Sequence, residues 1–253
     1  KQEQNWDNCT IPSCVKKEEN IMFYRYYFDP TYMLVIIGLL LTLMASALVK
    51  STYAKYKKVH SMSGMTGAQV AERILHQAGI YDVQIQHIAG DLTDNYNPKT
   101  KILSLSDAVY NNTSVAAIGV AAHECGHAIQ HAKEYAPLNL RSAMVPVVNI
   151  CSTLTWPAIF LGIILSWNQA LITLGILFFS AAVLFSLVTL PVEFDASHRA
   201  LKILGGTGML TQNEVGKARK VLTAAALTYV ASAAAMILQL LRLILLFGGD
   251  RDR

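Results

Sequence analysis

Four long apolar runs, separated by more polar segments, dominate the chain. They cover residues 33–49, 142–165, 170–190 and 221–247. A transmembrane helix needs about 20 predominantly apolar residues, and each run comes close to that length or exceeds it. Pro146 and Pro157 fall inside the second run, but membrane helices tolerate proline better than soluble helices do. The pattern predicts a mainly α membrane protein with about four transmembrane helices.

Basic residues next to these runs indicate an orientation. Lys50, Lys55, Lys57 and Lys58 directly follow the first run, and Lys and Arg recur between residues 199 and 220. The short loop 166–169 carries no charge. Because positive charge marks the cytoplasmic side of a span, we expect the first helix to run inward. The second and third helices then form a hairpin that leaves the cytoplasm and returns to it.

The chain divides accordingly into six segments. They are a polar N-terminal segment (1–22), an aromatic interface belt with the first transmembrane helix (23–49), a cytoplasmic domain (50–140), a transmembrane hairpin (141–190), a second cytoplasmic segment (191–220), and a fourth transmembrane helix with its tail (221–253). The first segment lacks the apolar core of a signal peptide. Its Cys9 and Cys14 are placed to close a small loop in an oxidising compartment. We expect this segment to lie outside, where a partner can contact it.

The cytoplasmic domain opens with a helix signal. Thr66 and Gln69 have the spacing of a capping box, and apolar residues then recur at helical intervals as far as Ala78. Gly79 is placed to end this helix. A second helix is predicted over residues 114–130, which contain no proline.

Two segments between these helices alternate as strands do, Val83–Ile88 and Ile102–Ser106. Residues 90–98 between them have the composition of turns. The second segment, through Ile102, Leu103, Ser104 and Leu105, is expected to present an exposed edge to which an extended substrate peptide can pair. The alternative is a plain hairpin that only packs on the following helix.

Composition narrows the function classes. With 53% hydrophobic and 15% charged residues, the chain is too apolar for an ordinary soluble domain. Its net charge of +4 is not clustered, which speaks against nucleic acid as a partner. The apolar runs hold few ionisable groups besides Arg242, whereas transport pathways usually need more. A lipid bilayer is the expected surroundings.

The strongest chemical signal is the run His123-Glu124-Cys125-Gly126-His127 within the second predicted helix. Two histidines four residues apart share one helix face and can converge on one cation. Glutamate directly after the first histidine is the general base in the zinc metalloprotease pattern. A helix with two incidental histidines is the plain alternative. His131 could also pair with His127, but Ala128 stands where that pair would need its glutamate, so we expect His131 near the surface or beside the site.

Catalytic zinc usually has three protein ligands and one open position, so a third ligand must come from elsewhere. Glu193 follows the predicted membrane hairpin and is our third ligand, which makes a His2Glu site for one zinc ion per chain. Asp195 is the rival ligand, or a partner that orients a histidine. Alternatively, Glu193 marks the membrane edge and pairs with Arg199. Tyr96 and His198 are candidates to stabilise the oxyanion.

Several stretches resemble the bacterial YugP-like membrane zinc metallopeptidases. They are Gly119-Val-Ala-Ala-His-Glu-Cys-Gly-His-Ala-Ile-Gln, Tyr27-Phe-Asp-Pro-Thr-Tyr, Asp94-Asn-Tyr-Asn-Pro and Glu193-Phe-Asp-Ala-Ser. The likeness extends from about Phe23 to the C-terminus. It implies a multi-pass protein of the bacterial plasma membrane, with His123 and His127 as zinc ligands and Glu124 as base.

More distantly, the chain is similar to HtpX-type and CAAX-type membrane proteases, whose third ligand is a glutamate after a membrane hairpin. This likeness supports Glu193. In those relatives Asp or Asn often stands four residues further on, where this chain has Ser197, and an aspartate lies at 195 instead. The family usually has alanine at Cys125, which is expected to be a small buried thiol.

Together these features predict a zinc-dependent metalloendopeptidase of the gluzincin type, with a zincin-like α+β domain on the cytoplasmic side. Glu124 would take a proton from water and pass it to the leaving amine. Protein or peptide substrates at the membrane surface, including membrane or misfolded proteins, are expected. The alternative is a non-catalytic membrane adaptor or regulatory subunit that retains a zinc site, although such a site has no need for Glu124.

Overall fold

The computed structural model describes residues 29–247. The interface belt expected before residue 29 and the polar segment with Cys9 and Cys14 lie outside the described residues. The tail after Phe247 does so as well.

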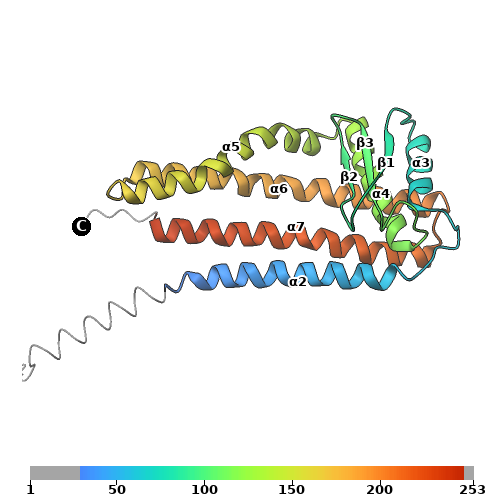
Figure 1. Ribbon diagram of the computed structural model, residues 1–253, viewed down its shortest axis with the longest axis horizontal. Coiled ribbons are helices and arrows are strands. Elements are labelled where there is room, and N and C mark those ends of the chain that lie inside the picture. Colours follow the sequence, from blue (N-terminus) through green and yellow to red (C-terminus); the bar gives the residue numbers. More distant parts are fainter. Residues whose placement is uncertain (1–28, 248–253) are drawn as a thin grey trace, which may run out of the picture.

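Four long helices form an elongated bundle. They are α2 (Tyr32–Tyr56), α5 (Ala136–Ile164), α6 (Gln169–Gly206) and α7 (Gln212–Phe247). Each is long and apolar enough to cross a membrane. In Figure 1, α2 begins and α7 ends at the end of the bundle opposite the sheet. The predicted mainly α membrane fold with four candidate spans is confirmed.

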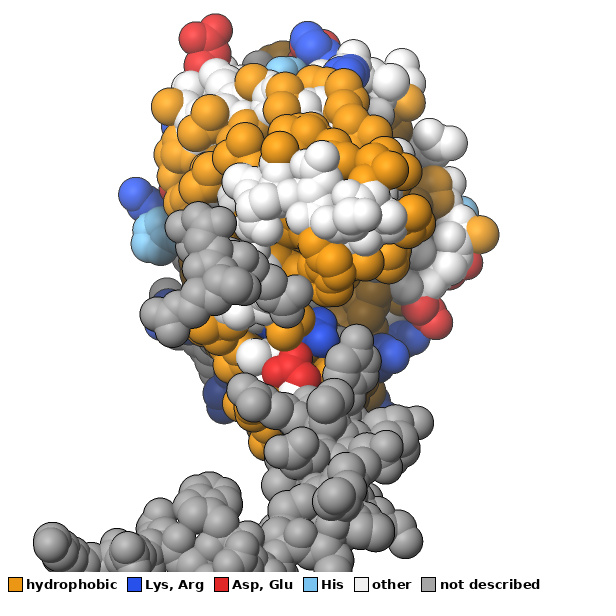
Figure 2. Space-filling view, turned by 90° about the vertical axis from the view of Figure 1, so that its left-hand side faces the viewer, with side chains coloured by type: hydrophobic (Ala, Val, Ile, Leu, Met, Phe, Trp, Pro, Cys, Tyr) orange, Lys and Arg blue, Asp and Glu red, His pale blue; other side chains and the backbone are white. Residues whose placement is uncertain are grey.

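The outer surface of this bundle is apolar. Leu39, Met44 and Leu177 are 56%, 68% and 65% exposed, and they belong to a much larger set of exposed aliphatic side chains on the four helices. Hydrophobic side chains also cover most of the end that faces the viewer in Figure 2. An apolar surface of this extent is unfavourable in water and suits a bilayer.

The third span does not end at Pro191, where the apolar run stops. Helix α6 continues without a break to Gly206, and α7 begins at Gln212, so most of the predicted cytoplasmic segment 191–220 is helical. Its Ala196, Ala200 and Leu204 are fully buried and lie four residues apart, which makes this part an amphipathic helix that packs on the soluble domain. The chain leaves the helix only at Thr207.

A small α+β unit sits at one end of the bundle. It contains α3 (Gly67–Gln77), β1 (Gln84–Ile88), β2 (Asn95–Asn97), β3 (Ile102–Ser106) and α4 (Val115–Ala132). The two predicted strands and both predicted helices are confirmed. The three-residue strand β2 was not predicted, because it lies within turn-like residues. The strand order is β1-β3-β2, with β1 parallel and β2 antiparallel to β3.

This order contradicts the expected substrate edge. Strand β3 is central, because β1 pairs along Ile102–Ser106 and β2 pairs with Ile102, Leu103 and Ser104. The carboxylate of Asp94 accepts the N–H of Ser106 at 2.7 Å beyond the end of β2. Leu103 and Leu105 are fully buried. The prediction that Ile102–Leu105 offers an edge is wrong, and so is the plain hairpin, because β1 and β3 are parallel.

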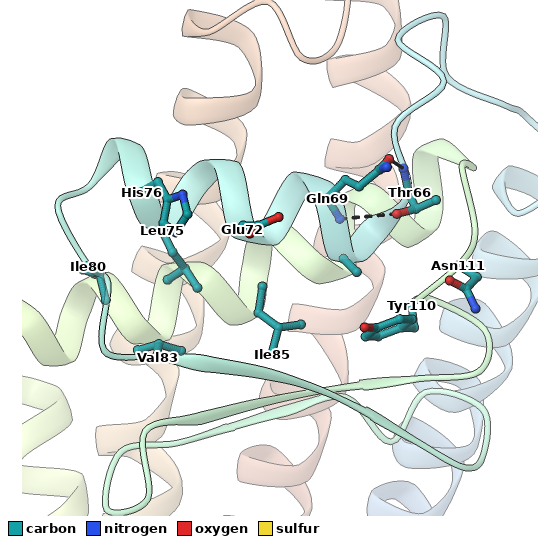
Figure 3. A pocket seen from close by; sticks show the side chains of 11 residues that line it. Thr66, Gln69, Glu72, Leu75, His76, Ile80, Val83, Ile85, Tyr110 and Asn111 are labelled. Atoms are coloured by element: carbon teal, nitrogen blue, oxygen red, sulfur yellow. Dashed lines mark hydrogen bonds between the residues drawn. The ribbon is translucent and has the colours of Figure 1, made fainter.

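Helix α3 begins with the predicted capping box, in which Thr66 and Gln69 each bond the other's backbone N–H. Gly79 follows the helix with φ +75°, a conformation that favours glycine. A groove of about 500 Å³ lies between α3 and β1, with Leu75 and Ile85 among the side chains that line it (Figure 3). None of the predicted catalytic or zinc-binding residues lines this groove.

Candidate metal centre

Helix α4 lies at the centre of the soluble unit. Ser114 caps its N-terminus by accepting the N–H of Ala117 at 3.2 Å. The helix is built largely of small residues, and most of it is buried between α3, β3, α6 and α7. The polar side chains of this helix therefore point toward the elements packed around it and not toward open solvent. His123, Glu124 and His127 are three of these side chains.

The two histidines converge with Glu193. The rings of His123 and His127 lie edge to face, with their centroids 4.7 Å apart. Glu193 Oε2 is 3.3 Å from His123 Nε2 and 3.6 Å from His127 Nε2. The three side chains each offer one ligand atom within 4.8 Å of the others. The structure thus brings together the three predicted ligands from α4 and α6. Their binding of zinc stays a prediction.

Hydrogen bonds at the Nδ1 atoms orient both rings. His127 Nδ1 is 3.0 Å from Gln130 Oε1, and the amide nitrogen of Gln130 donates to the Val192 carbonyl and to Asp195, each at 2.8 Å. The amide nitrogen of Gln130 uses its two N–H groups to donate to these two acceptors. The Gln130 oxygen therefore accepts a hydrogen bond from His127 Nδ1–H. This leaves the Nε2 lone pair of His127 directed toward Glu193.

Ser197 orients the other ring, with its hydroxyl 3.1 Å from His123 Nδ1.

Asp195 is not among the converging ligands. Its carboxylate bonds Gln130 and the Arg199 guanidinium, which lies 2.5 Å away. It therefore acts on His127 only through Gln130. The alternative pairing of Glu193 with Arg199 is not present, because Arg199 pairs with Asp195.

The donor set fits zinc. Among the described residues, Glu193 Oε2 is buried and receives no hydrogen bond, although it faces two imidazole nitrogens. A buried carboxylate oxygen without a donor is costly unless a cation satisfies it. Two histidines and one carboxylate are also the protein ligands of a common type of catalytic zinc site, which leaves one position open.

Glycine at position 126 lets α4 and α6 approach closely enough for this convergence. A Cβ atom there would lie 2.6 Å from the carbonyl oxygen of Ala196. That oxygen belongs to the rigid backbone of α6, three residues after Glu193, so the two helices would have to separate.

We therefore expect Gly126→Ala to weaken zinc binding and to lower kcat/KM by roughly 10²-fold, because small displacements of ligands are amplified in catalysis. Bound zinc and the cleavage rate of a test peptide measure this effect. Gly119→Ala, on the same helix, is the matched control, because its Cβ would be 3.5 Å from the Ala218 Cβ, an ordinary contact. Equal effects of the two substitutions would contradict this account.

Glu124 lies beside the cluster with 8% of its surface exposed. Burial raises the pKa of this carboxyl, and the neighbouring histidines oppose that rise. Cys125, the next residue, is fully buried and directs its thiol to the Ala71 carbonyl. Burial also raises the pKa of Cys125, so the predicted small buried thiol is confirmed.

Two cavities meet at the cluster. One, of about 260 Å³, is mainly apolar and includes Val49 and Leu222. The other, of about 170 Å³, includes Tyr96 and Arg141. Both are lined by His123, Glu124, Glu193, Asp94 and Tyr229. A substrate in either cavity would lie next to Glu124.

The two oxyanion candidates have different positions. Tyr96 lines the smaller cavity, and its hydroxyl is 3.0 Å from Nδ1 of His131. His131 therefore lies beside the site, in contact with one of its lining residues. His198 is exposed and lines a separate groove with Phe194 and Arg219. The structure does not bring His198 into either cavity at the cluster.

The site residues that were not predicted from the sequence include Gln130, Arg141 and Tyr229. Gln130 lies three residues after His127, a spacing that places two side chains on one helix face and could have indicated it. Arg141 and Tyr229 reach the cavity from α5 and α7. No local pattern connects these two residues with the histidines.

Comparisons with known proteins identify the family of this chain. Over 219 residues the chain is 48% identical to "Putative membrane protease YugP" of Bacillus subtilis (strain 168), and the match covers 87% of this chain and 97% of that protein. No solved structure matches the chain. The family model described as "Putative neutral zinc metallopeptidase" matches residues 31–248. The chain therefore belongs to the family of putative neutral zinc metallopeptidases.

Proposed function

We propose that this protein is a membrane zinc metalloendopeptidase that hydrolyses peptide bonds at the cytoplasmic membrane surface. One observation carries the proposal. Two Nε2 atoms and a buried carboxylate oxygen converge within 4.8 Å, and Glu124 lines the same two cavities. Glu124 is buried beside the cluster but is not one of the three converging ligand groups. A purely structural metal site has no use for such a glutamate, so the arrangement favours an enzyme over an adaptor.

Each polar group has a distinct task in hydrolysis. Zinc, when held by His123, His127 and Glu193, would supply Lewis acidity. Glu124 accepts a proton from the attacking water and later delivers it to the leaving amine nitrogen. Gln130 and Ser197 keep the imidazoles in place.

An extended substrate would run along β2. Among the described strands this one pairs only with β3, and Asn95 and Tyr96 line the smaller cavity. Adding a peptide strand to such an edge aligns the peptide by backbone hydrogen bonds and does not require a chain end. This supports an endopeptidase and replaces β3 as the proposed substrate edge.

The membrane and its orientation narrow the substrate class. Val49, on the candidate span α2, lines the larger cavity, and Lys50 follows it directly. The site therefore lies where the apolar part of α2 meets basic residues, which mark the cytoplasmic side. Membrane proteins and misfolded proteins of the bacterial plasma membrane reach this surface and are the proposed substrates.

Sealed membrane vesicles test activity and orientation together. Inside-out vesicles are expected to cleave an added unfolded soluble protein, whereas right-side-out vesicles cleave it only after detergent is added. A chelator should reduce the rate to that of vesicles without the enzyme, and zinc should restore it, because the proposed mechanism requires the metal as Lewis acid. Cleavage by intact right-side-out vesicles alone would overturn the cytoplasmic placement, and cleavage that a chelator leaves unchanged would overturn the zinc mechanism.

A further inference from the structure

Arg141 is a positively charged residue that lines the smaller cavity at the metal cluster. It lies on α5, near the start of that helix, and lines the cavity together with His123, Glu124 and Glu193. Its guanidinium lies over the ring of Phe185, 5.9 Å from the centroid. Its Nε atom is buried and donates to no acceptor among the described residues.

The carboxylates around Arg141 do not satisfy it. Asp94 accepts the backbone N–H and the hydroxyl of Ser106, and Glu193 faces the two histidines. No ion pair of Arg141 occurs in the described part of the chain. Arg141 is partly buried and keeps its charge under all ordinary conditions. Its buried Nε–H is costly to leave without an acceptor. Its position therefore suits an anionic group that arrives with the substrate.

Peptide hydrolysis generates such a group in this cavity. When the oxygen of water bonds to the scissile carbonyl carbon, the C=O π electrons move onto the carbonyl oxygen and the water proton moves to Glu124. The C–N bond then breaks, the electrons on the oxygen re-form the carbonyl, and the amine takes the proton from Glu124. The products are a carboxyl group and an amine, and Arg141 stays protonated throughout.

We propose, on the basis of the function proposed above, that Arg141 is a catalytic residue that donates hydrogen bonds to the oxyanion developing on the scissile carbonyl oxygen. Donors placed where charge develops act most strongly in a site shielded from water. Tyr96 is less suited to this task, because its hydroxyl already contacts His131 at 3.0 Å.

A rival role for Arg141 is to bind a carboxylate of the substrate, such as a free C-terminus. The small volume of this cavity, about 170 Å³, and the presence of Glu124 on its wall favour the reacting carbonyl instead. The two roles differ in kinetics: an oxyanion donor changes kcat, whereas a carboxylate anchor changes KM for substrates with that carboxylate.

The test uses detergent-purified full-length protein and two peptides that differ only in a free or an amidated C-terminus. Arg141→Gln is expected to lower kcat by roughly 10²–10³-fold on both peptides, the loss typical of one oxyanion donor. KM should change by less than about threefold, because the interaction is made mainly in the transition state. Arg141→Lys should be faster than Arg141→Gln, because lysine keeps the positive charge. It should remain slower than wild type, because lysine lacks the planar set of donors of the guanidinium.

Arg242 supplies the matched control. Its Nε is also buried without an acceptor, and its guanidinium lies over the Tyr32 ring at 4.3 Å, but it lies near the end of α7 that is far from the sheet (Figure 1). Arg242→Gln should leave kcat unchanged.

Two measurements independent of turnover accompany the kinetics. Bound zinc should be equal in wild type and Arg141→Gln. A phosphonamidate peptide, whose tetrahedral anion imitates the oxyanion, should bind Arg141→Gln at least about 10²-fold more weakly, in line with the loss in kcat.

Three results would overturn the assignment: an unchanged kcat in Arg141→Gln, a rise in KM confined to the peptide with a free carboxylate, or a loss of zinc from that variant. A wild-type protein that cleaves neither peptide and does not bind the phosphonamidate would instead count against the proposed function itself.

Discussion

Replacing Glu124 with glutamine will abolish peptide hydrolysis and leave zinc in place. Glutamine has nearly the same shape as glutamate, so the buried helix α4 and its two histidines keep their positions. It cannot accept the proton of the attacking water, and the loss of a general base typically lowers the rate by roughly 10²–10⁴-fold. Cleavage of an unfolded test protein by detergent-purified wild type and variant, with bound zinc quantified in both, measures this result.

Glu72→Gln is the matched control, because Glu72 is an exposed glutamate on α3. It should retain wild-type rates. Full activity of Glu124→Gln would remove Glu124 from the mechanism. If zinc is bound but neither wild type nor variant cleaves any test protein, the adaptor interpretation replaces the enzyme.

Replacing Glu193 with glutamine is expected to strip the site of zinc. Glu193 Oε2 is the only described carboxylate oxygen that faces both Nε2 atoms, at 3.3 and 3.6 Å. A neutral amide removes the charge that offsets the cation, and two histidines alone leave one ligand fewer than catalytic zinc usually has. Zinc that remains after dialysis against a weak chelator, and competition with a zinc-binding dye, measure the loss.

Asp195→Asn is the informative comparison, because Asp195 was the rival ligand. Its carboxylate supports His127 only through Gln130, and the loss of such a supporting partner typically costs about 10–100-fold in metal affinity or activity. Glu193→Gln should therefore lose more zinc than Asp195→Asn does. The reverse order would make Asp195 the ligand and Glu193 the supporting residue.

The two imidazoles of the cluster are supported by different partners. The Ser197 hydroxyl lies 3.1 Å from His123 Nδ1. A hydroxyl is neutral and can donate or accept, so it positions this ring without adding charge. The charged partner, Asp195, acts instead on the His127 side through Gln130. The two rings are therefore oriented by different chemistry.

Features with a local physical cause were predictable from the sequence. The four candidate spans follow from apolar runs, because burial of such runs in lipid depends on the length and composition of each segment alone. The capping box at Thr66 and the glycine at position 79 follow from hydrogen bonds and backbone angles within a few residues. The shared face of His123 and His127 follows from the repeat of the helix itself.

Features that depend on contacts between distant segments were decided only by the tertiary structure. The central place of β3 required β2, in which Asn95 and Asn97 flank Tyr96. Asparagine is depleted in strands, so the pairing with β3 decides the conformation of this segment. The continuation of α6 beyond Pro191 depends on the burial of Ala196, Ala200 and Leu204 against other elements. Arg141 and Tyr229 line the cavity because α5 and α7 pack around α4 and α6. The periodicity of each helix predicts which of its residues share a face, but it does not predict which side chains of separate helices meet.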